Sequence, residues 1–133
     1  MTIGLLLITH SRIGEAMLEI AGKMLEGAPL AVECLPVAID SNPDELIEQA
    51  SSLINRLDQG YGVLVFTDMY GSTPSNIAYK LAQKGRVNVI SGINLPMLIR
   101  TLNYQTMDLD TLTEKAVSGG KEGIICCESL NEQ

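Results

Sequence analysis

The chain has 133 residues and 46% hydrophobic content, which suits one folded domain over residues 1–133 and argues against disorder. With 16 acidic against 9 basic residues the net charge is -7, and no Lys/Arg cluster is present to neutralise phosphates, so we expect neither nucleic acid nor an anionic membrane as a partner. The 3 cysteines are an odd number and the first apolar run is too short for a signal peptide or a membrane span, so we expect a cytoplasmic protein without membrane insertion.

The first half of the chain alternates short apolar runs with helical patterns. The predicted elements are a strand over residues 3–8, a helix over 12–26, a strand over 32–37 and a helix from 42 to 57. Gly27 ends the first helical pattern, because glycine is favoured just beyond a helix C-terminus. Asn42 before Pro43 starts the second, since Asn caps the first turn and the φ angle of proline is already set for it.

The second half continues the same alternation. The predicted elements are a strand over residues 63–66, a helix from 75 to about 84, a strand over 87–90, a helix that opens at 94, a helix over 111–118 and a last strand over 123–127. Strands that alternate with helices predict βαβ units. The expected fold class is therefore α/β, a doubly wound and mainly parallel sheet with helices on both faces.

His10 is the only histidine of the chain and directly follows the first predicted strand. In an open α/β sheet, ligands bind where the C-terminal ends of the strands meet. Imidazole is the side chain whose ordinary pKa leaves it both nucleophile and acid near neutral pH. His10 is therefore the first candidate for covalent chemistry, although a lone histidine after a strand is more often an ordinary loop residue.

Asp68 follows the third predicted strand as His10 follows the first, so both side chains are expected at one edge of the sheet. A carboxylate that accepts a hydrogen bond from one imidazole nitrogen fixes the tautomer and leaves the other nitrogen as nucleophile. We assign that role to Asp68. Taken alone, an aspartate at this position is more often a loop or helix-cap residue.

Residues 71–76 (Gly-Ser-Thr-Pro-Ser-Asn) resemble a phosphate seat. Gly71 lets the backbone approach a ligand closely, and the hydroxyls of Thr73 and Ser75 and the N–H groups of a helix start can donate to an anion. The same residues also suit an ordinary helix N-terminus. Arg12 could hold a phosphate or meet an acidic group of a partner, and Asn94 opens a helix that faces the same edge.

Four segments, in this order along nearly the whole chain, resemble the IIA component of mannose-type bacterial sugar phosphotransferase systems. They are residues 8–11 (Ile-Thr-His-Ser), 66–76 (Phe-Thr-Asp-Met-Tyr-Gly-Ser-Thr-Pro-Ser-Asn), 89–98 (Val-Ile-Ser-Gly-Ile-Asn-Leu-Pro-Met-Leu) and 116–123 (Ala-Val-Ser-Gly-Gly-Lys-Glu-Gly). Two departures lie in the second segment. Tyr70 stands where many members carry tryptophan, and Ser72 stands where some carry a second glycine.

The resemblance implies that His10 accepts a phosphoryl group from the phosphocarrier HPr and passes it to a IIB partner. It implies that Asp68 orients the histidine and that Ser72 and Thr73 belong to a phosphate-contacting loop. It also implies a homodimer in which the last strand, here residues 123–127, runs antiparallel and is exchanged between subunits. We expect no metal and no cofactor, since positioning and hydrogen bonds suffice for transfer between two histidines.

Three other interpretations stay open from the sequence. The Thr-His-Ser-x-x-Gly-Glu context of residues 9–15 also resembles the phosphotransfer subunit of dihydroxyacetone kinase. A receiver-type module would be phosphorylated on Asp68, but it would need acidic residues after the first strand to hold Mg²⁺, where Thr9 and His10 stand. The third is a non-catalytic, flavodoxin-like regulatory protein. Phosphorylation of His10 by HPr separates the carrier from the receiver and from the regulator.

Overall fold

The computed structural model describes residues 1–27 and 29–128. Its sheet has four strands in the order β2-β1-β3-β4, and every neighbouring pair is parallel. The strands are β1 (Gly4–His10), β2 (Val32–Val37), β3 (Val63–Thr67) and β4 (Val87–Ser91). The predicted α/β fold with a parallel sheet is thereby confirmed, and the last residues of β1, β3 and β4 lie at one edge.

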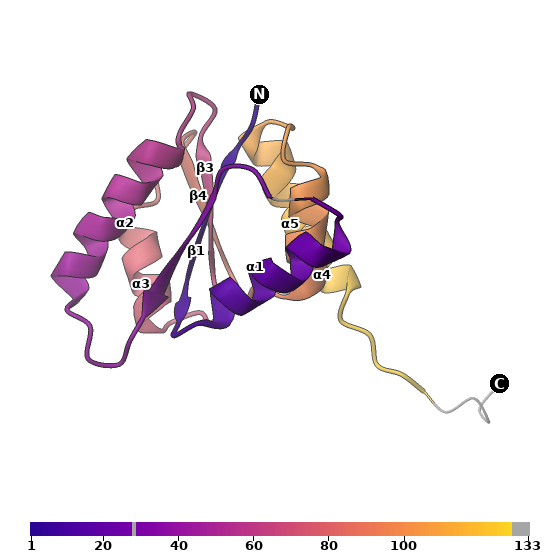
Figure 1. Ribbon diagram of the computed structural model, residues 1–133, viewed down its shortest axis with the longest axis horizontal. Helices are drawn as coiled ribbons and strands as arrows, with labels where there is room; N and C mark the ends of the chain where they lie inside the picture. Colours follow the sequence, from indigo (N-terminus) through magenta and orange to yellow (C-terminus); the bar gives the residue numbers. More distant parts are fainter. Residues whose placement is uncertain (28, 129–133) are drawn as a thin grey trace.

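Five helices cover the two faces of the sheet. They are α1 (Ile13–Met24), α2 (Pro43–Leu57), α3 (Thr73–Lys80), α4 (Leu95–Asn103) and α5 (Leu109–Glu122). Figure 1 shows α2 and α3 on one face and α1, α4 and α5 on the other. Alternate side chains of β1 enter two separate cores, Leu6 and Ile8 on the side of α2 and α3, and Leu5 and Leu7 on the other.

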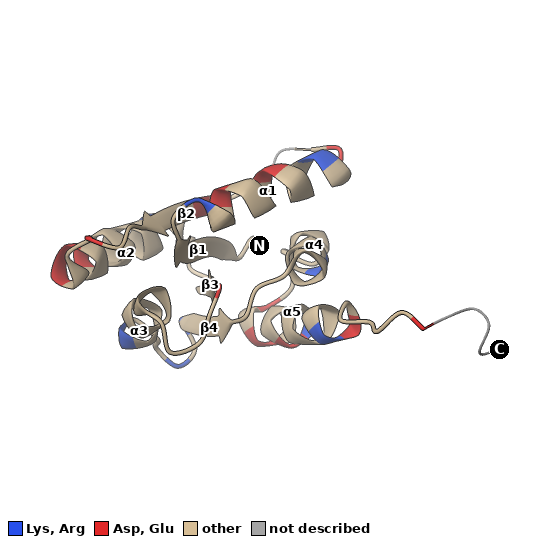
Figure 2. Cartoon of the chain, turned by 90° about the horizontal axis from the view of Figure 1, so that it is seen from below, with Lys and Arg blue, Asp and Glu red and all other residues tan. Residues whose placement is uncertain are grey.

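Charged side chains are distributed unevenly over the helices. Figure 2 shows Lys and Arg spread over α1, α3, α4 and α5, while acidic residues gather at one end of α2. These acids include Asp44 and Glu45 in the first turn of α2, where they meet the positive end of the helix dipole. Within residues 1–27 and 29–128, no helix combines the length and the apolar character that crossing a bilayer requires.

Three helix boundaries that lie near a glycine or a proline differ from the sequence prediction. The first helix ends at Met24, and Glu26 takes the positive φ of 54° that was expected of Gly27. Helix α3 begins two positions earlier than predicted, with Pro74 in its first turn. Helix α5 continues through Gly119 and Gly120 because it packs closely on α4. A Cβ at Gly119 would lie 2.7 Å from Cβ of Arg100.

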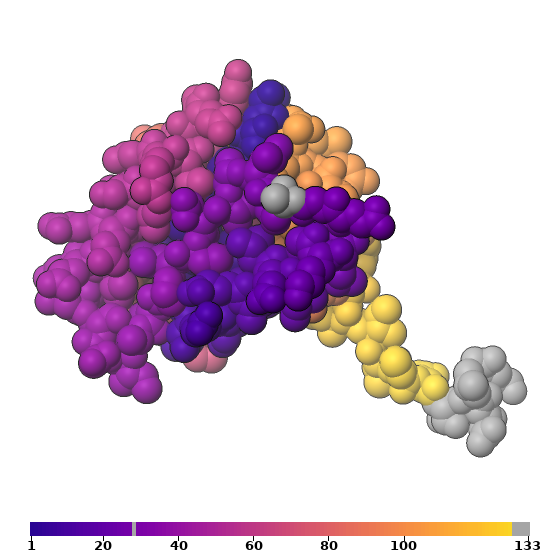
Figure 3. All heavy atoms as spheres, in the orientation of Figure 1, coloured from indigo at the N-terminus to yellow at the C-terminus, as the bar shows by residue number. Residues whose placement is uncertain are grey.

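The strand predicted over residues 123–127 is not formed in the chain. Gly123 caps α5, and residues 124–128 continue as an exposed segment without regular structure. Figure 3 shows this segment standing away from the body of the molecule. Ile124 and Ile125 are 76% and 73% exposed. The segment is apolar enough for a strand, but within the described chain it lies against no edge of the sheet. Its backbone therefore forms no strand-to-strand hydrogen bonds.

Asp58 joins the loop before β3 to the loop before β4. Burial alone would raise the pKa of Asp58, but N–H donors of Gly60 and Gly62 and the guanidinium of Arg86, 2.8 Å away, lower it below its ordinary value of 3.8. A carboxyl whose pKa is lowered by folding stabilises the fold above its ordinary pKa and loses that effect as the pH falls through its folded value.

We expect Asp58→Ala to lower the free energy of unfolding at pH 7 by about 1 to 3 kcal/mol, as for hydrogen bonds to a charged group. The difference from the wild type should narrow as the pH falls from the ordinary value of 3.8 to the lower folded value, because in that range the carboxyl binds a proton more readily in the unfolded chain. Urea unfolding followed by circular dichroism at a series of pH values measures both effects. A difference that stays constant down to acid unfolding would contradict the assignment.

Candidate active site

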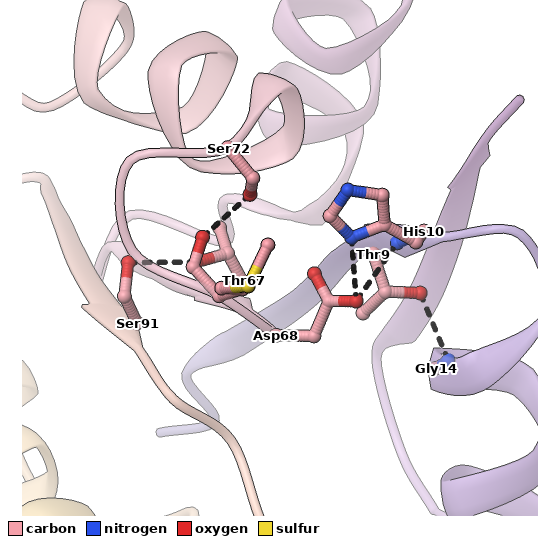
Figure 4. A network of polar contacts seen from close by, with 8 residues as sticks. Thr9, His10, Gly14, Thr67, Asp68, Ser72 and Ser91 are labelled. Atoms are coloured by element: carbon pink, nitrogen blue, oxygen red, sulfur yellow. Dashed lines mark hydrogen bonds and ion pairs between the residues drawn. The ribbon is translucent and has the colours of Figure 1, made fainter. Parts of the chain in front are cut away.

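His10 and Asp68 meet at the C-terminal edge of the sheet. Nδ1 of His10 lies 2.9 Å from Oδ2 of Asp68, and the backbone N–H of His10 donates to the same oxygen at 3.1 Å. Figure 4 shows both contacts, with the imidazole above the carboxylate. The side chain of His10 is 41% exposed, whereas that of Asp68 is 12% exposed. The two residues predicted as catalytic are therefore in direct contact.

This geometry decides which ring nitrogen faces outward. An ionised carboxylate only accepts hydrogen bonds, so Nδ1 carries the proton and Nε2 keeps its lone pair. The second carboxylate oxygen, Oδ1, is buried and has no hydrogen-bond partner among the residues described. Asp68 thus holds His10 by both its backbone and its ring through one oxygen, which leaves Nε2 as the available nucleophile.

The turn that follows His10 is held by its neighbours. The hydroxyl of the buried Thr9 accepts the N–H of Gly14 at 2.9 Å, which satisfies a donor in the first turn of α1. Ser11 has a φ of 46°, and its N–H donates to the carbonyl of Val37. A non-glycine residue in the left-handed region persists only where its surroundings impose it, so the backbone leaving the histidine has one defined path.

The predicted phosphate seat is a loop followed by the first turn of α3. Gly71 has a φ of 83°, which glycine adopts readily. Ser72 is half-buried, and its hydroxyl donates to the carbonyl of Met69, while Thr73 is exposed. Ser75 is fully buried, and its hydroxyl lies 3.3 Å from that of Ser91. Ser72 and Thr73 therefore border the surface, whereas Ser75 lies beneath the loop, where its hydroxyl faces that of Ser91.

The residues predicted to face a partner differ in their placement. Arg12 is exposed next to the site and forms only a long ion pair with Glu15, at 3.8 Å. Tyr70 is exposed and meets Tyr79 edge to face. Asn94 is half-buried, and its side-chain amide is already engaged in two hydrogen bonds. It caps α4 by accepting the N–H of Met97 and donates to the carbonyl of Gly120, so its role is to join α4 to α5.

The sequence interpretation assigned no role to the hydroxyls of Thr9, Thr67 and Ser91, which support the site. The hydroxyls of Thr67 and Ser91 lie 2.7 Å apart at the ends of β3 and β4. The available signal was a hydroxyl residue in one of the last two positions of a mainly apolar strand. Within the described part of the chain, no three His, Cys, Asp or Glu side chains gather as a metal site.

The comparisons with known proteins show the family and the fold of this chain. The EIIA-man family, described as the PTS system fructose IIA component, matches residues 4–117. The chain belongs to this family. It is therefore a IIA component of the mannose type of phosphotransferase system, as its four ordered segments predicted.

A curated relative is the mannose-specific EIIAB component of Escherichia coli K12, 35% identical over 127 residues. The match covers 93% of this chain but 39% of the relative. The mannose/sorbose specific IIA subunit from Enterococcus faecalis has the same fold, with a TM-score of 0.84 at 21% identity over 97% of both chains. A phosphotransferase system component EIIA from Streptococcus agalactiae gives 0.82 at 22% identity, over 93% of this chain and 96% of its own.

We expect the tautomer of His10 to depend on Asp68. In ¹⁵N spectra of histidine-labelled protein, the wild type should show a protonated Nδ1 and an unprotonated Nε2 once the ring is neutral. Asp68→Ala should populate both tautomers, because the acceptor is lost. Asp68→Asn should keep the wild-type tautomer, since its carbonyl oxygen can take the place of Oδ2. The single histidine makes the signals unambiguous. An unchanged spectrum in Asp68→Ala would show that the contact does not select the tautomer.

Proposed function

We propose that this chain is a phosphohistidine carrier in the cytoplasm, which accepts a phosphoryl group from HPr on His10 and passes it to a IIB component. The observation that supports this most directly is the contact of Nδ1 with Asp68, which leaves Nε2 free at the surface. Membership of the EIIA-man family supports it independently. The same membership favours the sugar system over a receiver module, and similarity to a mannose-specific component favours it over a dihydroxyacetone kinase subunit.

In the proposed step, the lone pair of Nε2 attacks the phosphorus of a phosphohistidine on HPr. A new N–P bond forms on His10 while the N–P bond on HPr breaks, and the departing ring keeps that electron pair. The proton on Nδ1 of His10 remains there, donated to Asp68. The phosphorylated ring carries positive charge, which the adjacent carboxylate stabilises. Transfer to IIB repeats the exchange with His10 as the leaving ring.

The first turn of α3 supplies donors for the phosphoryl oxygens in this scheme. The N–H groups of a first helical turn have no partner within the helix, and they point toward an anion at its N-terminus. Thr73 is exposed at this turn and adds a hydroxyl, while Ser72 lies beside it. Pro74 removes no helical hydrogen bond there. These groups receive the negative charge that develops during transfer.

Exposed apolar side chains surround the histidine. Ile13 follows β1, Ile39 follows β2, and Met69 and Tyr70 follow β3, and all four are exposed. Apolar and aromatic side chains at a surface are typical of protein interfaces. Because HPr and IIB must each bring a histidine to Nε2, we propose that both dock on this rim in turn.

The test is transfer in a reconstituted system. With phosphoenolpyruvate, enzyme I and HPr, we expect one phosphoryl group on His10, stable in alkali and labile in acid as a phosphohistidine is. His10→Gln should remain unlabelled. Asp68→Asn should take the label more slowly, because it loses the charge that stabilises the phosphorylated ring. An alkali-labile label on Asp68 would overturn the carrier proposal in favour of a receiver module.

We also propose that the exposed segment 124–127 pairs with a second copy of the chain as an exchanged, antiparallel strand. Strands β2 and β4 are the two edges of the sheet. Pro36 in β2 has no N–H to donate, which disfavours pairing there, so β4 of the partner is the acceptor edge. Pairing would bury Ile124 and Ile125, whose exposure in the single chain is unfavourable.

We therefore expect light scattering to give the mass of a dimer at micromolar concentration. Ile124→Asp combined with Ile125→Asp should shift the protein toward a monomer, because charge would be buried at the shared edge. Ile20→Asp is the matched control, since Ile20 is also exposed but lies on α1. A monomeric wild type, or a double variant that stays fully dimeric, would contradict the exchanged strand.

A further inference from the structure

Three hydroxyl groups form a buried chain beneath the phosphate loop. Oγ1 of Thr67 lies 2.7 Å from Oγ of Ser91, and Oγ of Ser91 lies 3.3 Å from Oγ of Ser75. The N–H of Gly71 then donates to Oγ of Ser75 at 3.4 Å. Thr67 and Ser75 are fully inaccessible, and Ser91 is half-buried. Figure 4 shows the contact between Thr67 and Ser91 on the side of the loop away from His10.

The sheet itself does not need these hydroxyls. Thr67 and Ser91 lie opposite each other where β3 pairs with β4. The other four residues of β3 are apolar. The carbonyl of Thr67 already accepts the N–H groups of Gly92 and Ile93. Burying a hydroxyl is costly unless it is hydrogen-bonded, and valine would fill the place of Thr67 without that cost. The hydroxyls therefore do something that the ladder does not.

Their effect is to tie the loop to two strands. Ser75 is the third residue of α3, and its hydroxyl accepts the N–H of Gly71, which lies before the helix. In a capping box, the side chain of the third helical residue likewise accepts a backbone N–H that precedes the helix. The other tie of this loop is local, from Ser72 to the carbonyl of Met69. Among the hydrogen bonds of the residues that the structure describes, the link from this loop to β4 runs through Ser91.

We propose that Thr67, Ser91 and Ser75 are positioning residues for phosphoryl transfer, holding the Thr73 hydroxyl and the first turn of α3 at the place that the phosphoryl group occupies. None of the three touches the phosphoryl group. The inference rests on the proposed carrier function and extends it to residues behind the site. Preorganised donors cost no rearrangement during transfer, whereas a misplacement near 1 Å can slow a reaction about 100-fold.

The test compares two buried threonines. Thr67→Val removes a hydroxyl of the chain, and Thr101→Val is the matched control, because Thr101 is equally buried but its hydroxyl donates to Met97 within α4. Single-turnover transfer from phosphorylated HPr is measured over a range of HPr concentrations. For Thr67→Val we expect the maximal rate to fall about 10- to 100-fold, with the HPr concentration at half-maximum unchanged. Thr101→Val should keep the wild-type rate, and Thr67→Ser should restore it.

Amide hydrogen exchange gives a readout that does not depend on phosphoryl transfer. The N–H groups of Gly71 and Ser72 should exchange at least about 10-fold faster in Thr67→Val than in Thr101→Val when both variants show a similar loss of melting temperature. Ser91→Ala, a smaller change, should show the same pattern if Thr67→Val does not fold. The inference would be overturned if Thr67→Val or Ser91→Ala folds and shows either unchanged amide exchange or an unchanged transfer rate. If the wild type is not labelled on His10, the carrier function is overturned instead. Hydrogen exchange would then still decide whether the hydroxyl chain holds the loop in place.

Discussion

Oxygen Oδ2 of Asp68 accepts the Nδ1–H of the His10 ring and also the backbone N–H of that residue. The first bond orients the imidazole, and the second ties the end of β1 to the residue after β3. The position of the nucleophile relative to the sheet and the direction of its free nitrogen are thus set by one atom. A charge-assisted hydrogen bond is stronger than a neutral one, so the carboxylate suits this double role. The rest of the site is arranged around this point.

The strand order makes that arrangement possible. Because β3 lies between β1 and β4, the segments after these three strands meet at neighbouring places on one edge. The first carries His10, the second carries Asp68 and the loop to α3, and the third places Ser91 beneath that loop. Each segment leaves a parallel strand, and the crossover helices return the chain to the opposite end of the sheet. The proposed nucleophile, the carboxylate that contacts it and a helix N-terminus therefore come together from parts of the chain that are far apart in sequence.

Features that depend on local sequence could be predicted, and those that depend on packing could not. Apolar runs and the Asn-Pro helix start located the strands and α2, and the strand-end positions of His10 and Asp68 predicted their contact. Gly119 and Gly120 suggested a helix end, but they permit close packing of α5 on α4, which only the tertiary structure reveals. Ser75 was predicted to bind phosphate from its residue type, yet its burial depends on where Ser91 lies. The apolar segment after α5 needs a partner edge that one chain does not contain.

A carrier has a constraint that a hydrolytic enzyme lacks, because it must release the group that it has just bound. Every 1.4 kcal/mol of extra stabilisation of the phosphorylated state slows its discharge or shifts its equilibrium about tenfold. The site fits that constraint. His10 is half-open to solvent, one carboxylate supports it, and the donors nearest the surface are hydroxyls and a helix N-terminus rather than a cluster of cations. Such groups favour the transition state through placement more than through strength. In the proposed carrier function, precise positioning of the loop by the residues behind it would speed transfer without trapping the phosphoryl group.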